Sequence, residues 1–248
     1  MASARYTIYI KPEDIQPDAP PKELTPKEKR ENFWFYHKWH VIIGVFACAL
    51  AFSLIWEIVT QVKPDYTISI LSSNGIPTGV GEVLGEQLTP YFDDRNGDGR
   101  VVVSVVEYTV ASGDAVAGVD PNVQMANITK LMGDLDLGES MLFLTDDLDF
   151  FEQQYYLFAY NDASIPAEGV PPDYDRMGVR WGDCPVLTSL DLGNAVDITG
   201  APGIDYQTFL QDFQLVQRYI DGTKLEDDKD AIAYHAASVE KFGELTRR

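Results

Sequence analysis

The feature that most constrains this chain is an apolar run near its start, VIIGVFACALAFSLIWEIVT at residues 41–60. Its first sixteen residues, 41–56, carry no charge. A helix rises about 1.5 Å per residue, so twenty residues reach roughly 30 Å, the thickness of a bilayer's hydrocarbon core. The run therefore predicts a transmembrane helix, with the residues before it on one side of a membrane and those after it on the other.

The flanks of this run are typical of a membrane helix rather than of a buried helix in a soluble protein. Aromatic residues, which favour membrane interfaces, stand at both ends of the run: Trp34, Phe35, Tyr36, Trp39 and Trp56. A cleavable signal peptide would begin close to the N-terminus, whereas residues 1–40 precede this run. We therefore expect an uncleaved, single-pass anchor that contacts the lipid bilayer.

Basic residues indicate how the anchor is oriented. Four of them lie in the N-terminal flank of the run: Lys27, Lys29, Arg30 and Lys38. After the run, Lys63 is the only basic residue before Arg95. Basic residues in short flanking segments stay preferentially on the cytoplasmic side of a membrane. The N-terminus is therefore predicted to be cytoplasmic and the C-terminal part extracellular, at the cell membrane.

The 248-residue chain has a formal net charge of -20, and this charge belongs to the part beyond the run. Residues 61–248 contain 12 Lys and Arg against 32 Asp and Glu, a difference of -20. An acidic surface repels the phosphates of nucleic acids, so we expect no nucleic-acid partner. Cys48 inside the run and Cys184 beyond it cannot form an intrachain disulfide. An outer domain without disulfides must rely on an ordinary core, which suits a bacterial surface protein.

These observations divide the chain into three parts. Residues 1–24, with four prolines among charged residues, are expected to be a disordered cytoplasmic tail. Residues 25–62 are expected to be a juxtamembrane and transmembrane helix. At its start, Thr25, Pro26 and Glu28 have the spacing of a capped helix, in which the Thr and Glu side chains satisfy unpaired amides. Residues 63–248 are expected to form an extracytoplasmic domain.

Strand and helix patterns alternate in the first half of this outer domain. Apolar and β-branched residues predict strands at residues 66–72, 101–110 and 141–144. Helical spacing predicts helices at residues 80–92 and from residue 120 onward. The second of these helices has four apolar residues on one face: Met125, Ile128, Met132 and Leu135. The order implies parallel crossovers, so the predicted fold is α/β, with a mostly parallel sheet flanked by helices.

The second half of the outer domain has weaker patterns. A helical turn is predicted at residues 148–151, and strands are predicted at residues 155–160 and 180–187. Residues 206–220 fit a helix, but their alternation also allows a strand. Residues 227–245 predict a closing helix, because their apolar residues recur at helical spacing.

A short segment, DRNGDGRV at residues 94–101, has the pattern of a calcium loop of the EF-hand or dockerin kind. Asp94, Asn96 and Asp98 supply oxygens at positions one, three and five, and Arg100 at position seven supplies a main-chain carbonyl. Position twelve departs from the pattern, because it is Val105 rather than a glutamate. The alternative is that Asn-Gly and Asp-Gly are turn dipeptides. The segment would lie at the amino edge of the sheet, so a Ca²⁺ ion there is predicted to be structural.

Polar residues are predicted at the carboxyl edge of the sheet, where open α/β sheets bind ligands. They lie at the ends of the three predicted strands: Ser73 and Asn74, Glu107 and Tyr108, and Asp146 and Asp147. Unpaired amides at nearby helix N-termini favour a small polar ligand. Loops at strand ends are polar in any α/β domain, so an ordinary loop is the alternative interpretation.

The order of these segments resembles that of type 2 extracellular solute-binding proteins. The resemblance covers about residues 64–245 and rests on a tethered, disulfide-free α/β domain with a short polar loop after its first strand and a closing helix. It implies a ligand cleft between two lobes. The domain is shorter than is usual in that family, and it has a transmembrane helix where the family usually has a lipid anchor.

Motifs of known catalytic sites are absent from the sequence. It contains no Gly-x-Ser-x-Gly, phosphate loop, His-Glu-x-x-His or zinc-type cysteine spacing. We therefore expect a non-catalytic outer domain that binds a small molecule. The alternative is an interaction or assembly ectodomain that docks on another membrane or cell-surface protein.

Overall fold

The computed structural model describes residues 25–60, 63–110, 120–167, 169–196 and 202–247 of the chain. The predicted tail, residues 1–24, lies outside the described residues. The chain divides into two units, residues 1–62 and residues 63–248, which are treated separately below.

The described part of the first unit forms one long helix, α1 (Pro26–Thr60). It starts as predicted: Thr25 N donates to Glu28 Oε2 (2.8 Å), and Glu28 N donates to Thr25 Oγ1 (3.4 Å). These reciprocal bonds satisfy amides that have no partner within the helix. By length and composition α1 is able to cross a membrane, and none of its apolar window is buried.

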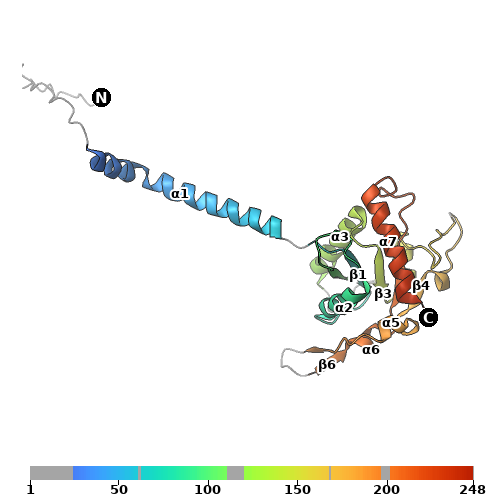
Figure 1. Ribbon diagram of the computed structural model, residues 1–248. Coiled ribbons are helices and arrows are strands. Elements are labelled where there is room, and N and C mark those ends of the chain that lie inside the picture. Colours follow the sequence, from blue (N-terminus) through green and yellow to red (C-terminus); the bar gives the residue numbers. More distant parts are fainter. Residues whose placement is uncertain (1–24, 61–62, 111–119, 168, 197–201, 248) are drawn as a thin grey trace, which may run out of the picture. The chain divides into compact units, whose positions relative to one another are not determined.

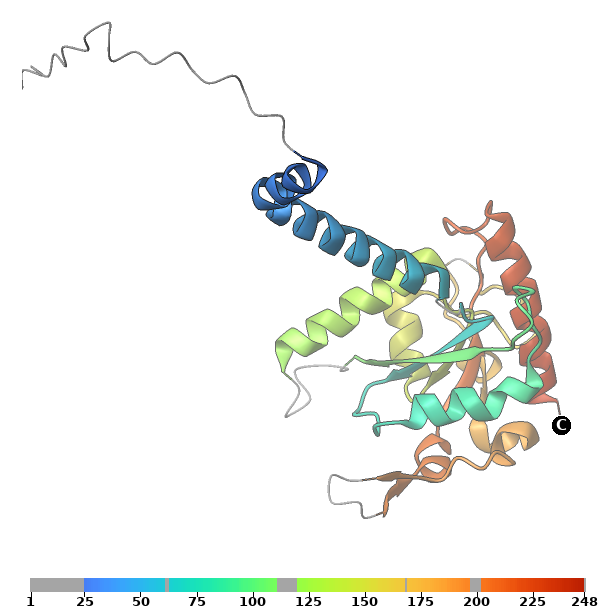
Figure 2. The ribbon, with the colours of Figure 1, turned by 60° about the vertical axis from the view of Figure 1, so that its left-hand side comes forward.

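A five-stranded sheet forms the centre of the second unit (Figures 1 and 2). Its strands are β1 (Tyr66–Ser72), β2 (Val103–Thr109), β3 (Leu142–Thr145), β4 (Gly178–Arg180) and β7 (Gln214–Gln217). They lie in the order β2-β1-β3-β7-β4. β1 pairs in parallel with β2 and β3, whereas β7 is antiparallel to both β3 and β4. β1, β2, β3 and β4 therefore run in one direction and β7 in the other, so the sheet is mixed, with the parallel majority that was predicted.

Helices cover both faces of the sheet, so the predicted α/β layer structure is confirmed. One face packs against α2 (Val80–Leu88) and α7 (Lys229–Thr246), and the other against α3 (Pro121–Leu137) and α4 (Leu148–Tyr155). Ile68 and Ile70 of β1 belong to the first layer, and Leu71 belongs to the second. Successive strand residues point to opposite faces, which is why both layers receive apolar side chains from the same strand.

Short elements complete the second unit. Among its described residues they are three 3-10 helices, η2 (Thr89–Tyr91), η3 (Tyr174–Arg176) and η4 (Trp181–Asp183), two short helices, α5 (Pro185–Thr188) and α6 (Tyr206–Leu210), and a hairpin of β5 (Asn194–Val196) and β6 (Pro202–Asp205). The hairpin was not predicted from the sequence.

Two predictions in the second half of the domain need correction, and the two alternatives of a third are both present. Residues 155–160 are not a strand, because α4 extends to Tyr155 and Phe158 makes only an isolated bridge with Arg218. Residues 180–187 are not a strand either, because β4 ends at Arg180 and η4 and α5 follow. Residues 206–220 contain both predicted structures in turn, the helix α6 and then the strand β7.

The buried face of α3 is rotated from the face predicted by its apolar spacing. Leu131 is fully buried, and Ile128 and Leu135 pack against the core. Met125 and Met132 are 64% and 51% exposed. The rotation arises because Asp134, one turn after Leu131, also points into the protein, where Tyr108 and two serines donate hydrogen bonds to its carboxylate.

Helix α2 lies directly against the outer edge of β2. Val102 O accepts from Asp65 N (2.8 Å), so Val102 faces β1 and the carbonyl of Val103 faces outward. Gly85 of α2 lies against this outward carbonyl, and a Cβ atom on Gly85 would be 2.6 Å from Val103 O. The glycine thus lets α2 shield an edge strand that would otherwise expose unpaired main-chain groups.

This close approach makes Gly85→Ala a test of the contact between α2 and β2. The substitution is expected to lower the free energy of unfolding by about 1–3 kcal/mol, because the added methyl group forces α2 away from β2. Urea unfolding of the detergent-solubilised chain measures the change. As a control, a Cβ on Gly133 in α3 would have no atom within 4 Å, so Gly133→Ala is expected to raise stability by up to about 1 kcal/mol. Equal effects of the two substitutions would contradict the close packing.

Candidate functional site

Three of the predicted carboxyl-edge residues lie together at the ends of β1 and β3. Asp146 Oδ1 accepts from Ser73 N (2.8 Å), and Asp146 Oδ2 accepts from Ser72 Oγ (2.6 Å) and Asn74 Nδ2 (3.3 Å). The sequence therefore identified a real cluster of Ser73, Asn74 and Asp146. Its polar atoms bond mainly to one another, which joins the two loops and leaves few groups for a ligand.

The other three predicted residues do not join this cluster. Glu107 Oε1 accepts from Gly81 N (2.9 Å) at the start of α2, whereas Tyr108 is 1% exposed on the opposite face of the sheet. Asp147 is the N-cap of α4 and accepts from Phe150 N (3.1 Å). Glu107 and Tyr108 separate because neighbouring strand residues point to opposite faces.

A buried carboxylate that the sequence did not indicate explains the position of Tyr108. Asp134 is 4% exposed, and its Oδ2 accepts from Tyr108 OH (3.0 Å), Ser69 Oγ (3.0 Å) and Ser140 Oγ (2.9 Å). Its Oδ1 accepts from Ser140 N (2.9 Å). Burial, and then the negative charge of Asp134, raise the pKa of Tyr108 above its usual range, so the phenol stays protonated as a donor. These bonds compensate for the burial of the charge, as a structural network requires.

A polar cavity of about 340 Å³ lies beside β4 and the start of α4, and is called the β4 cavity here. Its lining comes from four separate parts of the second unit: Asp149, Asn161, Tyr174, Asp175, Gly178, Val179, Arg180, Asp183 and Gln214. Asp149 follows the predicted Asp147 by two residues, so the predicted region borders the cavity without forming it. A sequence signal for the other lining residues is lacking, because they lie in short, irregular elements.

The charged groups of the β4 cavity are three aspartates, Asp149, Asp175 and Asp183, and one arginine, Arg180. Across the described residues, none of these four side chains makes a hydrogen bond or ion pair. Trp181 N donates to Phe213 O (2.8 Å), so Trp181 faces β7 and the main-chain N–H of its neighbour Arg180 faces the outer edge of β4. The cavity therefore offers anionic groups together with a few donors.

The predicted calcium loop curls its side-chain oxygens inward. Asp94 Oδ1 accepts from Gly97 N (2.6 Å), and Asp94 Oδ2 accepts from Gly99 N (2.8 Å). Asn96 Oδ1 accepts from Asp98 N (2.9 Å), and Asp98 Oδ1 accepts from Arg100 N (2.9 Å). Three oxygen side chains and the Arg100 carbonyl thus remain the donor set available for Ca²⁺, and Val105 in β2 adds no carboxylate.

Two further aspartates, Asp65 and Asp93, hold this loop at the amino edge of the sheet. Asp65, which is fully buried, accepts from Asn96 N and Val102 N (both 2.9 Å). Asp93 accepts from Tyr66 OH (3.1 Å) and pairs with Lys241 of α7 (3.1 Å). Burial raises the pKa of Asp93, but the bonds from Lys241 and Tyr66 outweigh it and hold the pKa below its usual range. The loop is therefore held in place by the protein itself.

Metal binding by this loop stays a prediction. Within the described ranges, no group of three or more His, Cys, Asp and Glu side chains is placed to hold a metal ion. That survey covers only those four residue types, whereas the predicted donor set includes Asn96 and a main-chain carbonyl.

Comparisons of the chain with family models, with curated proteins and with solved structures found no match. The resemblance to type 2 extracellular solute-binding proteins therefore stays a prediction from segment order. Arguments about function rest on the geometry of this chain.

Tyr108→Phe separates the structural role of Tyr108 from its predicted role in ligand binding. Loss of the hydroxyl removes one donor from the buried Asp134, so the free energy of unfolding should fall by about 1–3 kcal/mol. Urea unfolding measures this change. Tyr91→Phe is the matched control, because Tyr91 is 39% exposed, and its effect should stay within about 0.5 kcal/mol. If both variants were equally stable, the network would contribute nothing to stability.

Proposed function

We propose that this chain is a single-pass membrane protein whose extracytoplasmic domain binds a small polar ligand without catalysing a reaction. The ligand site is assigned to the β4 cavity, and the anchor to α1. The observation that carries this proposal is the set of four charged side chains that face the β4 cavity without protein partners. The cavity volume of about 340 Å³ suits a small molecule.

The charges of the β4 cavity favour a ligand that carries a positive charge. Asp149, Asp175 and Asp183 outnumber Arg180, so the local charge is negative. The net charge of the whole domain is also negative, and an acidic surface raises the local concentration of cations. Arg180 and its main-chain N–H supply donors for a polar group elsewhere on the same ligand. A small amine with a second, hydrogen-bond-accepting group meets both conditions.

The membrane anchor is supported by the length and apolar composition of α1. The excess of basic residues before the apolar run supports a cytoplasmic N-terminus and an extracellular second unit. In this arrangement the ligand cavity faces the outside of the cell, while α1 connects it to the cytoplasmic side.

A structural Ca²⁺ ion in the loop of residues 94–100 belongs to the same proposal. Asp94, Asn96 and Asp98 direct their oxygens into one loop, and Arg100 provides a carbonyl at the expected position. The loop lies at the amino edge of the sheet, away from the carboxyl ends of β3 and β4, so the ion would stabilise the domain rather than contact the ligand.

A second candidate function is an interaction or assembly ectodomain. It is favoured by the exposed apolar side chains of α3, because Met125 is 64% and Met132 is 51% exposed. Exposed Met side chains adapt to differing surfaces and are frequent at protein interfaces. The ligand experiment below distinguishes the two functions.

Small amines, amino acids and neutral sugars should be compared by thermal shift on the full chain in detergent. At about a hundredfold excess over Kd, a cationic ligand should raise the melting temperature by about 5–10 °C. The variant Asp149→Asn/Asp183→Asn should lose this shift, because it removes two of the three anionic groups. The control Asp212→Asn/Asp227→Asn changes two exposed acids outside the cavity and should retain the shift.

A shift that survives Asp149→Asn/Asp183→Asn contradicts ligand binding at the β4 cavity, and no shift with any compound contradicts ligand binding as a whole. In the second case, the alternative function predicts a self-associated chain or a crosslinked partner. Met125→Lys/Met132→Lys should then abolish that association, because it places charges on the exposed face of α3.

Calcium should raise the melting temperature of the full chain by about 2–4 °C for each kcal/mol of binding energy. Magnesium at the same concentration should have a much smaller effect, because it demands a stricter geometry and holds its water ligands. Asp98→Ala should remove the calcium effect, and Asp212→Ala should preserve it. Identical melting with calcium and with a chelator would show that the loop is an ordinary turn.

A further inference from the structure

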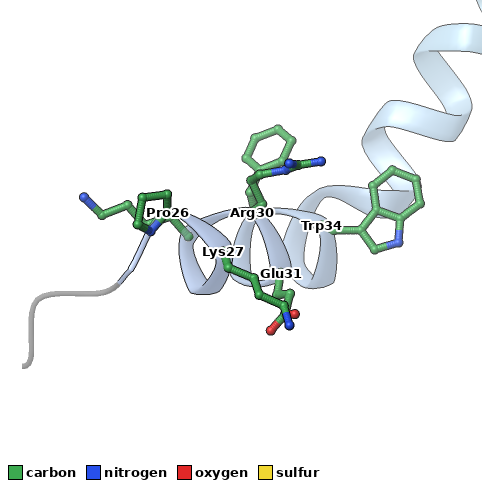
Figure 3. A pocket seen from close by; sticks show the side chains of 7 residues that line it. Pro26, Lys27, Arg30, Glu31 and Trp34 are labelled. Carbon is green, nitrogen blue, oxygen red and sulfur yellow. The ribbon is translucent and has the colours of Figure 1, made fainter.

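The first turns of α1 run in a different direction from the rest of the helix, as Figure 3 shows around Trp34. His37 Nδ1 lies 3.2 Å from Phe33 O at this bend. A side chain that reaches the carbonyl four residues earlier competes with the helical hydrogen bond, which is a recognised cause of bending. The bend therefore separates a short N-terminal segment, residues 26–34, from the apolar part of α1.

If α1 were straight, this segment would lie too far from the hydrocarbon core to reach the lipid headgroups. The apolar run of residues 41–60 already fills the roughly 30 Å hydrocarbon core. In a straight α1, Arg30 would lie about 16 Å beyond the edge of that core. The headgroup layer extends only about 5–8 Å on each side. Trp34 itself would lie about 10 Å beyond that edge. The bend turns the segment from the helix axis, so that its long Lys and Arg side chains are able to reach down to the headgroup layer.

The bent segment has a basic and aromatic surface. A hollow on the segment is lined by seven described residues: Pro26, Lys27, Lys29, Arg30, Glu31, Phe33 and Trp34. Three of them are cations and one is an anion. Figure 3 shows Arg30 on one side of the helix, and Lys27 and Glu31 on another. Phe33 and Trp34 are 56% and 54% exposed, and the Phe33 ring stacks on His37 with the ring centroids 4.6 Å apart.

The charge of the segment is not cancelled by its own acids. The carboxylate of Glu28 accepts from Thr25 N (2.8 Å) and Thr25 Oγ1 (2.9 Å), so it serves to cap the helix. Lys27, Lys29 and Arg30 outnumber Glu28 and Glu31 by one, so residues 26–34 keep a net charge of +1. Among the lining residues, Glu31 lies on the side of Lys27, whereas Arg30 lies on another side of the helix.

We propose that residues 26–34 lie on the cytoplasmic membrane surface and bind the phosphate groups of anionic phospholipids. Lys27, Lys29 and Arg30 contact the phosphates, and Phe33 and Trp34 insert their rings at the headgroup level. Basic residues near an anionic leaflet each contribute to such binding, and aromatic rings anchor it. This inference rests on the proposed membrane anchor and its orientation.

Hydrogen exchange of the full chain in lipid nanodiscs tests the proposal. Amides of residues 28–34 should exchange at least about tenfold more slowly in discs with one-third phosphatidylglycerol than in discs of phosphatidylcholine alone. Lys27→Gln/Lys29→Gln/Arg30→Gln should lose this difference and keep the helix, since Gln has a similar helix propensity. The control Lys224→Gln/Lys229→Gln/Arg247→Gln changes the net charge equally in the second unit and should retain the difference.

The outcomes separate this inference from the proposed anchor. A chain that enters both discs but shows equal exchange in them overturns lipid binding by the segment and leaves the anchor intact. A difference that persists in Lys27→Gln/Lys29→Gln/Arg30→Gln overturns the role of the three cations. A chain that does not remain with the discs overturns the anchor, and with it the inference.

Discussion

The second unit depends on the burial of β1 on both of its faces. Ile68 and Ile70 pack into the layer of α2 and α7, while Leu71 packs into the layer of α3 and α4. A strand with two apolar faces needs a helix layer on each side, so the three-layer arrangement follows from this one strand. The residues at its ends then fix both edges of the sheet. Asp65 accepts hydrogen bonds from Asn96 N and Val102 N, and Ser72 Oγ donates a hydrogen bond to Asp146.

The charged groups of this domain fall into two classes, those that hydrogen-bond to the protein and those that face an open cavity. Asp134 and Asp65 are buried, and the protein supplies every donor that their carboxylates accept. Asp183 and Arg180 face a cavity and have no partner among the described residues. A buried charge without donors would destabilise the fold, whereas a charge at an open cavity is solvated until a ligand arrives. This difference is the physical reason for placing the ligand site at the β4 cavity rather than at the better-bonded cluster around Asp146.

Local patterns predicted the elements that are long or have a clear period. The strand at residues 66–72 and the capped start of α1 agree with the structure residue by residue. Prediction failed at residues 155–160 and 180–187, where elements of three or four residues are too short to show a period. It also failed for the exposed Met125, because apolar spacing cannot show that Asp134 takes a place on the buried face of α3.

The sequence by itself determined the apolar helix, its basic flank and the acidity of the second unit, because composition and short-range spacing carry that information. It also determined the turn-forming loop of Asp94, Asn96 and Asp98, whose side-chain oxygens accept from amides of the loop itself. Only the tertiary structure decided which charges face a common cavity, since Asp149 and Asp183 belong to segments far apart in the chain. Their meeting depends on β7 and β4 adding to the sheet beside β3, and that strand order arises from packing of the whole domain.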